Sequence, residues 1–99
     1  MKIITICGSF KYKDDMINIA EKLCLEGNCV LSPLYPICDK KYSDNEKKML
    51  GKIHFERIKI SDAILVVDID GYIGDATNKE IEFAKSLDKE IIYYSNLIK

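Results

Sequence analysis

Apolar residues along this chain gather into short, nearly unbroken runs, and the segments between the runs repeat their apolar residues at helical spacing. The runs cover residues 2–7, 29–32, 63–69 and 90–94 and are rich in β-branched side chains. They are too short for helices of ordinary length, and they lack the apolar–polar alternation of a half-exposed strand. The pattern therefore predicts four strands that are buried on both faces.

The segment at residues 14–26 is predicted to form the first helix. It ends before Gly27, a residue that terminates helices readily because it accepts the left-handed conformation. Its inward face is expected to carry Ile17, Ala20, Leu23 and Cys24.

Two further helices are expected. Ser43 with Glu46 three residues later fits a capping box, which predicts a helix that runs from there to about Ser61. Its inward face is expected to carry Met49, Leu50, Ile53 and Ile60. The third helix is predicted at residues 77–87, with Ile81, Ala84 and Leu87 inward.

Strands and helices thus alternate strictly, which is typical of an α/β fold with a parallel sheet and helices on both faces. Right-handed crossovers favour a doubly wound, flavodoxin-like sheet with strand order 2-1-3-4. At 99 residues, the whole chain (1–99) is expected to be one domain. Four strands bury little surface, so a homo-oligomer is expected.

Charge and composition limit the classes of binding partner that the chain is expected to have. The chain has 15 Lys and Arg against 16 Asp and Glu, a net charge of −1, which gives no reason to expect nucleic acid as a partner. The longest apolar run, 63–67, is too short to span a bilayer, and no signal peptide pattern is present, so we expect no membrane and a cytoplasmic location. The expected free, mostly buried thiols are Cys7, Cys24, Cys29 and Cys38, and without C-x-x-C spacing they suggest no metal or cofactor.

Ligands of doubly wound sheets bind beyond the carboxyl ends of the strands, next to the first strand. Three segments are expected to converge there, at residues 8–13, 31–36 and 68–80. Gly8 and Ser9 follow the first strand, and Lys11 is nearby, so backbone N–H groups, a hydroxyl and ammonium groups could hold a phosphate. On the alternative interpretation, Gly8 makes a tight turn and Ser9 is a solvated loop residue.

Glu80 is the strongest candidate for chemistry at this edge. It is expected in the first turn of the third helix, where the helix dipole favours an ionised carboxylate suited to a nucleophile or proton acceptor. The alternative is structural, because Thr77 and Glu80 also fit a capping box. Asp75 offers a second carboxylate, with a helix cap as its alternative role. A lone histidine, His54, is more often structural than catalytic.

Several motifs in this order resemble the nucleoside 2-deoxyribosyltransferase superfamily, which includes 2′-deoxynucleoside 5′-phosphate N-hydrolases. They are residues 6–9 (ICGS), 61–67 (SDAILVV), 74–80 with the following IEFA, and 88–92 (DKEII). Residues 54–57 (HFER), 71–74 (GYIG) and 80–84 (EIEFA) resemble most closely small bacterial and phage members without an assigned activity.

The resemblance implies that Glu80 attacks C1′ of a deoxyribosyl group and forms a covalent sugar–enzyme intermediate, which water or a second base resolves. It also implies a nucleoside or nucleotide as the small-molecule partner, no metal or cofactor, and a homo-oligomer. The residues expected around the substrate or its phosphate are Cys7, Gly8, Ser9, Lys11, Gly71, Tyr72, Gly74 and Thr77.

Three positions depart from the superfamily pattern. His54 stands where active members carry an aspartate that helps protonate the base, Gly74 where they carry an aspartate or a phosphate-binding serine, and Glu82 where they carry a glycine. Asp75 or His54 could then serve as the proton donor. The alternative function is a non-catalytic nucleotide-binding or sensing module on the same fold.

Overall fold

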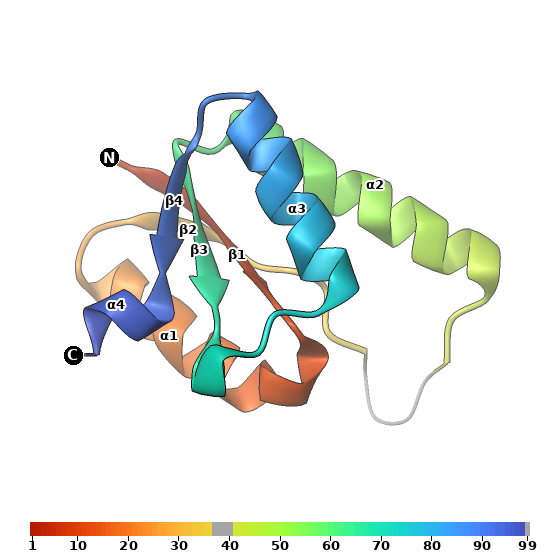
Figure 1. Ribbon diagram of the computed structural model, residues 1–99, viewed down its shortest axis with the longest axis horizontal. Coiled ribbons are helices and arrows are strands. Elements are labelled where there is room, and N and C mark those ends of the chain that lie inside the picture. The colour runs from red at the N-terminus through yellow and green to blue at the C-terminus, as the bar shows by residue number, and fades with distance from the viewer. Residues whose placement is uncertain (37–40, 99) are drawn as a thin grey trace.

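The computed structural model describes residues 1–36 and 41–98, and the described residues form a four-stranded parallel sheet. The strands are β1 (Ile3–Gly8), β2 (Cys29–Leu31), β3 (Ala63–Val67) and β4 (Glu90–Tyr93), and the helices are α1 (Lys13–Leu25), α2 (Asp44–Ile60), α3 (Asp75–Ser86) and α4 (Tyr94–Leu97). The strand order is β2-β1-β3-β4 (Figure 1). The predicted doubly wound sheet of order 2-1-3-4 is therefore confirmed.

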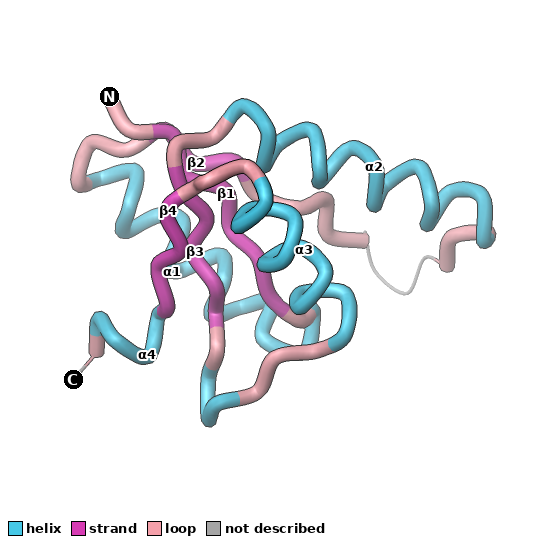
Figure 2. Tube along the Cα trace, turned by 45° about the horizontal axis from the view of Figure 1, so that its top comes forward, coloured by secondary structure: helices cyan, strands magenta, loops and turns pink. Residues whose placement is uncertain are grey.

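The helices divide between the two faces of the sheet (Figure 2). α1 packs on one face through Met16 and Ile19, while α2 and α3 pack on the other through Ile58, Ile81 and Ala84. Because side chains of a strand point alternately to opposite faces, each strand serves both layers.

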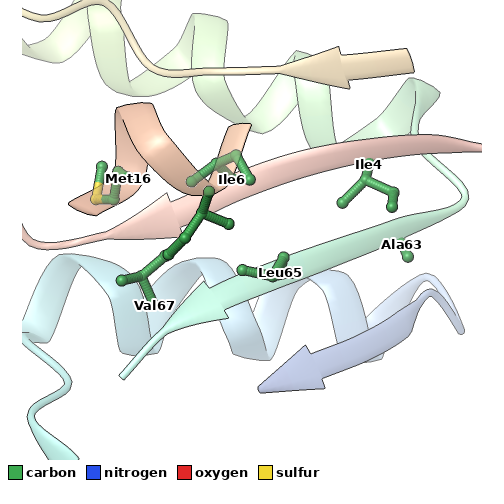
Figure 3. Packing of buried hydrophobic residues seen from close by; sticks show 7 residues of the cluster. Ile4, Ile6, Met16, Ala63, Leu65 and Val67 are labelled. Atoms are coloured by element: carbon green, nitrogen blue, oxygen red, sulfur yellow. The ribbon is translucent and has the colours of Figure 1, made fainter. Parts of the chain in front are cut away.

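The fully buried side chains on the face under α1 are all hydrophobic. β1 contributes Ile4 and Ile6, and β3 contributes Ala63, Leu65 and Val67, all at most 3% exposed (Figure 3). We call this layer the apolar face. The side chains between them, Thr5, Cys7, Ile64 and Val66, point to the opposite layer under α2 and α3, which we call the mixed face.

A hydrogen-bond network ties the end of α2 to β1 on the mixed face. The Ser61 hydroxyl donates to the carbonyl of Arg57, and the Thr5 hydroxyl shares its one proton between the Ser61 oxygen and the same carbonyl. Asp62, the next residue, accepts a hydrogen bond from the N–H of Ile3 at 2.8 Å. These bonds satisfy polar groups that burial would otherwise leave unpaired.

The capping box at the start of α2 is confirmed, since Ser43 accepts from the N–H of Glu46 and Glu46 accepts from that of Ser43. The predicted inward face of α2 is wrong except at Leu50, which is half-buried. Met49, Ile53 and Ile60 are 57%, 40% and 64% exposed, and the helix buries His54 and Ile58 instead. Apolar spacing alone misplaced this face because one of its two buried anchors is a polar side chain.

Smaller differences occur elsewhere. In α1 the buried residues are Met16 and Ile19, whereas Ile17 and Cys24 are exposed. Leu87 is 40% exposed rather than inward. β3 ends at Val67, because Ile69–Gly71 turns as a 3-10 helix in which Asp70 has a φ of 55°. The short α4 was not predicted.

Of the cysteines, Cys7 is buried and Cys24 and Cys29 are exposed, so the prediction of mostly buried thiols is wrong for these two. All three are free, as predicted. Cys38 lies outside the described residues. None of the helices within residues 1–36 and 41–98 has the length and apolar character needed to cross a bilayer.

Candidate functional site

A cavity of about 540 Å³ opens at the carboxyl edge of the sheet. Its walls come from residues 8–10 after β1, from Pro33, Leu34 and Pro36 after β2, from α2, and from residues 74–77 with Glu80 on α3. The predicted convergence of three loop segments at this edge is therefore confirmed. The volume lies within the range of pockets that hold small molecules.

The predicted site residues fall into two groups. Seven of them line the cavity, namely Gly8, Ser9, His54, Gly74, Asp75, Thr77 and Glu80. Cys7 is fully buried and contacts His54. Lys11, Gly71 and Tyr72 are not among the described residues that line it; the Lys11 ammonium instead lies 4.1 Å from the centre of the Tyr72 ring.

Gly8 is required where β1 meets α1. A Cβ at this position would come within 2.8 Å of the Met16 sulfur and 3.2 Å of the Val67 Cβ, so a side chain here would force the buried Met16 and Val67 to shift. Ser9 next to it caps the following 3-10 turn by accepting a hydrogen bond from the N–H of Lys11 at 3.3 Å. The Ser9 hydroxyl therefore has a local structural role in addition to lining the cavity.

Glu80 lies one turn further into its helix than predicted. α3 begins at Asp75 with Gly74 as N-cap, so Glu80 is in the second turn and Thr77 is inside the helix, not at its start. The predicted capping box of Thr77 and Glu80 is therefore wrong, and so is the expectation that the helix dipole sets the charge of Glu80. Burial dominates instead and raises the pKa of Glu80 to about 7.

His54 points from α2 toward β1 and α3. Its Nε2 atom lies 3.6 Å from Cys7 Sγ and 3.8 Å from Glu80 Oε1, and its Nδ1 lies 3.1 Å from a terminal nitrogen of Arg57. Burial and the Arg57 charge lower the pKa of His54 to about 4, although a hydrogen bond with the backbone of Ile6 acts to raise this pKa. His54 is therefore neutral at physiological pH, and its contact with Glu80 is not an ion pair.

The site brings together Cys7, His54 and Glu80, but it is not arranged as a cysteine–histidine–acid triad. In such triads the two ring nitrogens contact different partners, one the nucleophile and the other the acid. Here the same nitrogen, Nε2, faces both the thiol and the carboxylate. Burial, reinforced by Glu80, also raises the pKa of Cys7 well above its usual value, which disfavours the thiolate nucleophile.

One ligand atom from each of these three side chains lies within 4.8 Å of the others, close enough to hold a metal ion in principle. The Arg57 guanidinium, in contact with the imidazole, adds a positive charge that opposes a divalent cation. The prediction that the chain binds no metal stays a prediction.

The sequence interpretation placed His54 at the site but missed the other residues that α2 contributes to the wall, namely Lys47, Leu50, Gly51 and Arg57. These positions follow the spacing of one helical stripe, which is a usable signal. It was overlooked because the stripe mixes cationic, apolar and glycine residues, whereas the search for an inward face followed apolar residues only.

No model of a known protein family matches the sequence, and no curated protein matches it either. Among solved structures, the chain is similar to the 2-desoxiribosyltransferase from Leishmania mexicana, with a TM-score of 0.71 and 17% sequence identity. The match covers 95% of this chain and 64% of that protein. The superfamily fold expected from the motifs is therefore confirmed, whereas identity at this level carries the fold alone.

Proposed function

We propose that this protein cleaves or transfers the N-glycosidic bond of a 2′-deoxynucleoside or its 5′-monophosphate, with Glu80 as the nucleophile. The observation that carries the proposal is the placement of Glu80. Its side chain is 18% exposed and lines the cavity at the carboxyl edge of the sheet, and its pKa of about 7 leaves it partly ionised near neutral pH. A desolvated carboxylate is a stronger nucleophile than one in water.

In the proposed reaction the Glu80 carboxylate adds to C1′ of the sugar as the bond from C1′ to the base nitrogen breaks. The electron pair of that bond passes to the base, which takes up a proton. Water or a second base then attacks C1′ and releases the Glu80 carboxylate, as in other retaining glycosyl transfers. The likeness to a protein named as a desoxiribosyltransferase supports this class of chemistry.

Asp75 is the proton donor in this proposal. It lines the same cavity as Glu80, five residues before it on α3. His54 is unsuited to that role at neutral pH, because a ring with a pKa of about 4 carries no acidic proton to give. His54 instead lies beside the nucleophile, with its Nε2 atom 3.8 Å from Glu80 Oε1.

The 5′ end of the substrate is assigned to the turn after β1. Residues 8 and 9 and the first turn of α3 line the same cavity, and α3 carries no side-chain cap at Gly74. Uncapped N–H groups at a helix start favour a phosphate or hydroxyl, and the Asp75 carboxyl in the same turn competes for those N–H groups.

The alternative function, nucleotide binding without cleavage, is favoured by one observation. The position that carries an aspartate in active members is occupied by His54, which is neutral and packed against Arg57. Such a site would bind the ligand but protonate the leaving base slowly.

The test incubates the purified protein with each deoxynucleoside and deoxynucleoside monophosphate, with and without an acceptor base, and measures released base by chromatography. Glu80→Gln is the diagnostic variant and Glu82→Gln, on the exposed side of the same helix, is its matched control. We expect a loss of about 10³-fold or more in Glu80→Gln and full activity in Glu82→Gln.

Equal activity in both variants would contradict a nucleophilic role for Glu80. Absence of base release from every substrate, together with thermal stabilisation by one nucleotide, would support the binding module instead.

A further inference from the structure

Arg57 contacts the site through His54 rather than through Glu80. One of its terminal nitrogens lies 3.1 Å from His54 Nδ1, one turn earlier on the same helix. A guanidinium has only donors and keeps its proton in proteins, so the atom that it contacts must accept. In a neutral imidazole one nitrogen accepts and the other carries the proton. Nδ1 being the acceptor, the proton belongs on Nε2.

The groups on the Nε2 side of the ring fit this assignment. Cys7 Sγ on β1 lies 3.6 Å away and Glu80 Oε1 on α3 lies 3.8 Å away, and an ionised carboxylate only accepts hydrogen bonds. The hydrogen bond with the backbone of Ile6 also favours a protonated ring nitrogen. The Cys7 thiol can donate or accept at Nε2, so the contact that decides between the two tautomers is that of Arg57 with Nδ1.

We infer that Arg57 is a positioning residue that fixes His54 as the tautomer protonated at Nε2 and thereby presents an N–H to the Glu80 carboxylate. The opposite tautomer would turn a nitrogen lone pair toward Glu80. The carboxyl could then bond to the ring only in its protonated form, which is not a nucleophile. Arg57 thus acts on the charge of Glu80 without touching it.

The separation of 3.8 Å is longer than a hydrogen bond, and catalytic hydrogen bonds in unliganded sites commonly shorten when the substrate binds. The tautomer itself stands on the Arg57 contact alone. Its consequence for turnover rests on the proposed function, so the two are tested by separate measurements.

The first measurement is direct, because His54 is the single histidine of the sequence. Two-bond ¹H–¹⁵N correlation spectra of protein labelled in histidine, recorded at pH 8, assign the proton to one ring nitrogen without ambiguity. We expect one tautomer, protonated at Nε2, in the native protein. In Arg57→Met the two ¹⁵N shifts should move toward each other as both tautomers become populated.

Arg57→Glu is the decisive variant, because a carboxylate in place of the guanidinium accepts from Nδ1–H and should invert the tautomer. Neither substitution removes the Arg57 carbonyl that accepts from Thr5 and Ser61. Lys59→Met is the matched control, since it deletes a neighbouring cation whose partner is the exposed Glu56 and should leave the spectrum unchanged. Thermal unfolding checks that each variant is folded.

A native spectrum with the proton on Nδ1, or an Arg57→Glu spectrum identical to the native one in a folded protein, would overturn the inference. The second measurement is the pH profile of base release. We expect Arg57→Glu to lower kcat about tenfold or more and to move the acidic limb of the profile to higher pH, with Lys59→Met unchanged. An inverted tautomer without any such shift would overturn the catalytic consequence, and no activity in the native protein would overturn the proposed function but not the tautomer.

Discussion

The two faces of the sheet are equally buried but chemically different. On the apolar face the described core residues are all hydrophobic, from Ile4 to Val67. On the mixed face β1 carries Thr5 and Cys7. α2 adds the buried His54, and its C-cap residue is the buried Ser61. Successive residues of β1 thus alternate between two layers. The apolar face stabilises the fold, whereas the mixed face stabilises the fold and also carries the site. Buried polar side chains are tolerated on the mixed face because each of them has a hydrogen-bonding partner there.

The largest effect on the free energy of unfolding is expected on the apolar face. Leu65 is 1% exposed and packs between β1 and α1, so Leu65→Ala should destabilise the protein by about 3 kcal/mol through lost burial and a cavity. Urea unfolding measures this loss, with Ile60→Ala, at an exposed position, as a control expected to change little. A loss in the free energy of unfolding below about 1 kcal/mol would mean that packing on the apolar face contributes little to stability.

On the mixed face, a substitution of Glu80 is expected to increase the free energy of unfolding rather than to lower it. In the unfolded chain Glu80 titrates at its ordinary pKa of 4.5 and in the folded protein at about 7. Between these values the folded state binds more protons, so the contribution of Glu80 to stability is lost as the pH rises. By pH 8 this amounts to about 3 kcal/mol, which Glu80→Gln should recover.

His54 works against Glu80 in the same pH window. Its pKa is lowered from 6.5 to about 4, so its contribution to stability is present above 6.5 and lost as the pH falls. The two slopes nearly cancel between pH 4.5 and 6.5 in the native protein. Urea unfolding should therefore show a nearly flat native profile from pH 5 to 6.5 and a rising one for Glu80→Gln over the same range. A constant difference between the two proteins at every pH would contradict this account.

The smallest effect on the free energy of unfolding is expected for the hydroxyl network of Thr5 and Ser61 on the mixed face. Thr5→Val keeps the shape of the side chain but removes bonds to Ser61 and Arg57, at an expected cost of about 1 kcal/mol. In a double-mutant cycle with Ser61→Ala the two losses should not add, whereas Ile4→Val with Ser61→Ala should be additive. Additivity in the first cycle would show that the hydroxyls act independently.

The topology was predictable because it depends on the order of strongly patterned segments. Residues 63–67 have no polar member, so their assignment to a central buried strand needed no knowledge of neighbours. The capping box at Ser43 was likewise a local signal, and the structure forms it. Thr77 and Glu80 carry the same local signal, but the helix begins earlier, at Asp75, which places Thr77 in its first turn.

The site was only partly predictable, for a different reason. The edge of the sheet and Glu80 follow from topology, but the environment of Glu80 depends on which face α2 buries. A scan for apolar spacing selects Met49 and Ile53 and passes over His54, whose burial is compensated by Cys7, Arg57 and the backbone of Ile6. Cys7 and Ile6 are distant from His54 in the sequence, so their contacts leave no local pattern, and the raised pKa of Glu80 was not predicted.

The order in which the chain is synthesised gives a further meaning to the buried Asp68 at the end of β3. Its two carboxylate oxygens accept from the N–H and the hydroxyl of Ser95, at 2.8 and 2.6 Å. Ser95 leaves the ribosome 27 residues after Asp68, so this carboxylate has no partner in Ser95 until β4 has been made. The start of the stretch that leads from Asp68 to the cavity wall at Gly74 is thus anchored only after Ser95 has been made, and not by β1 and β3 alone.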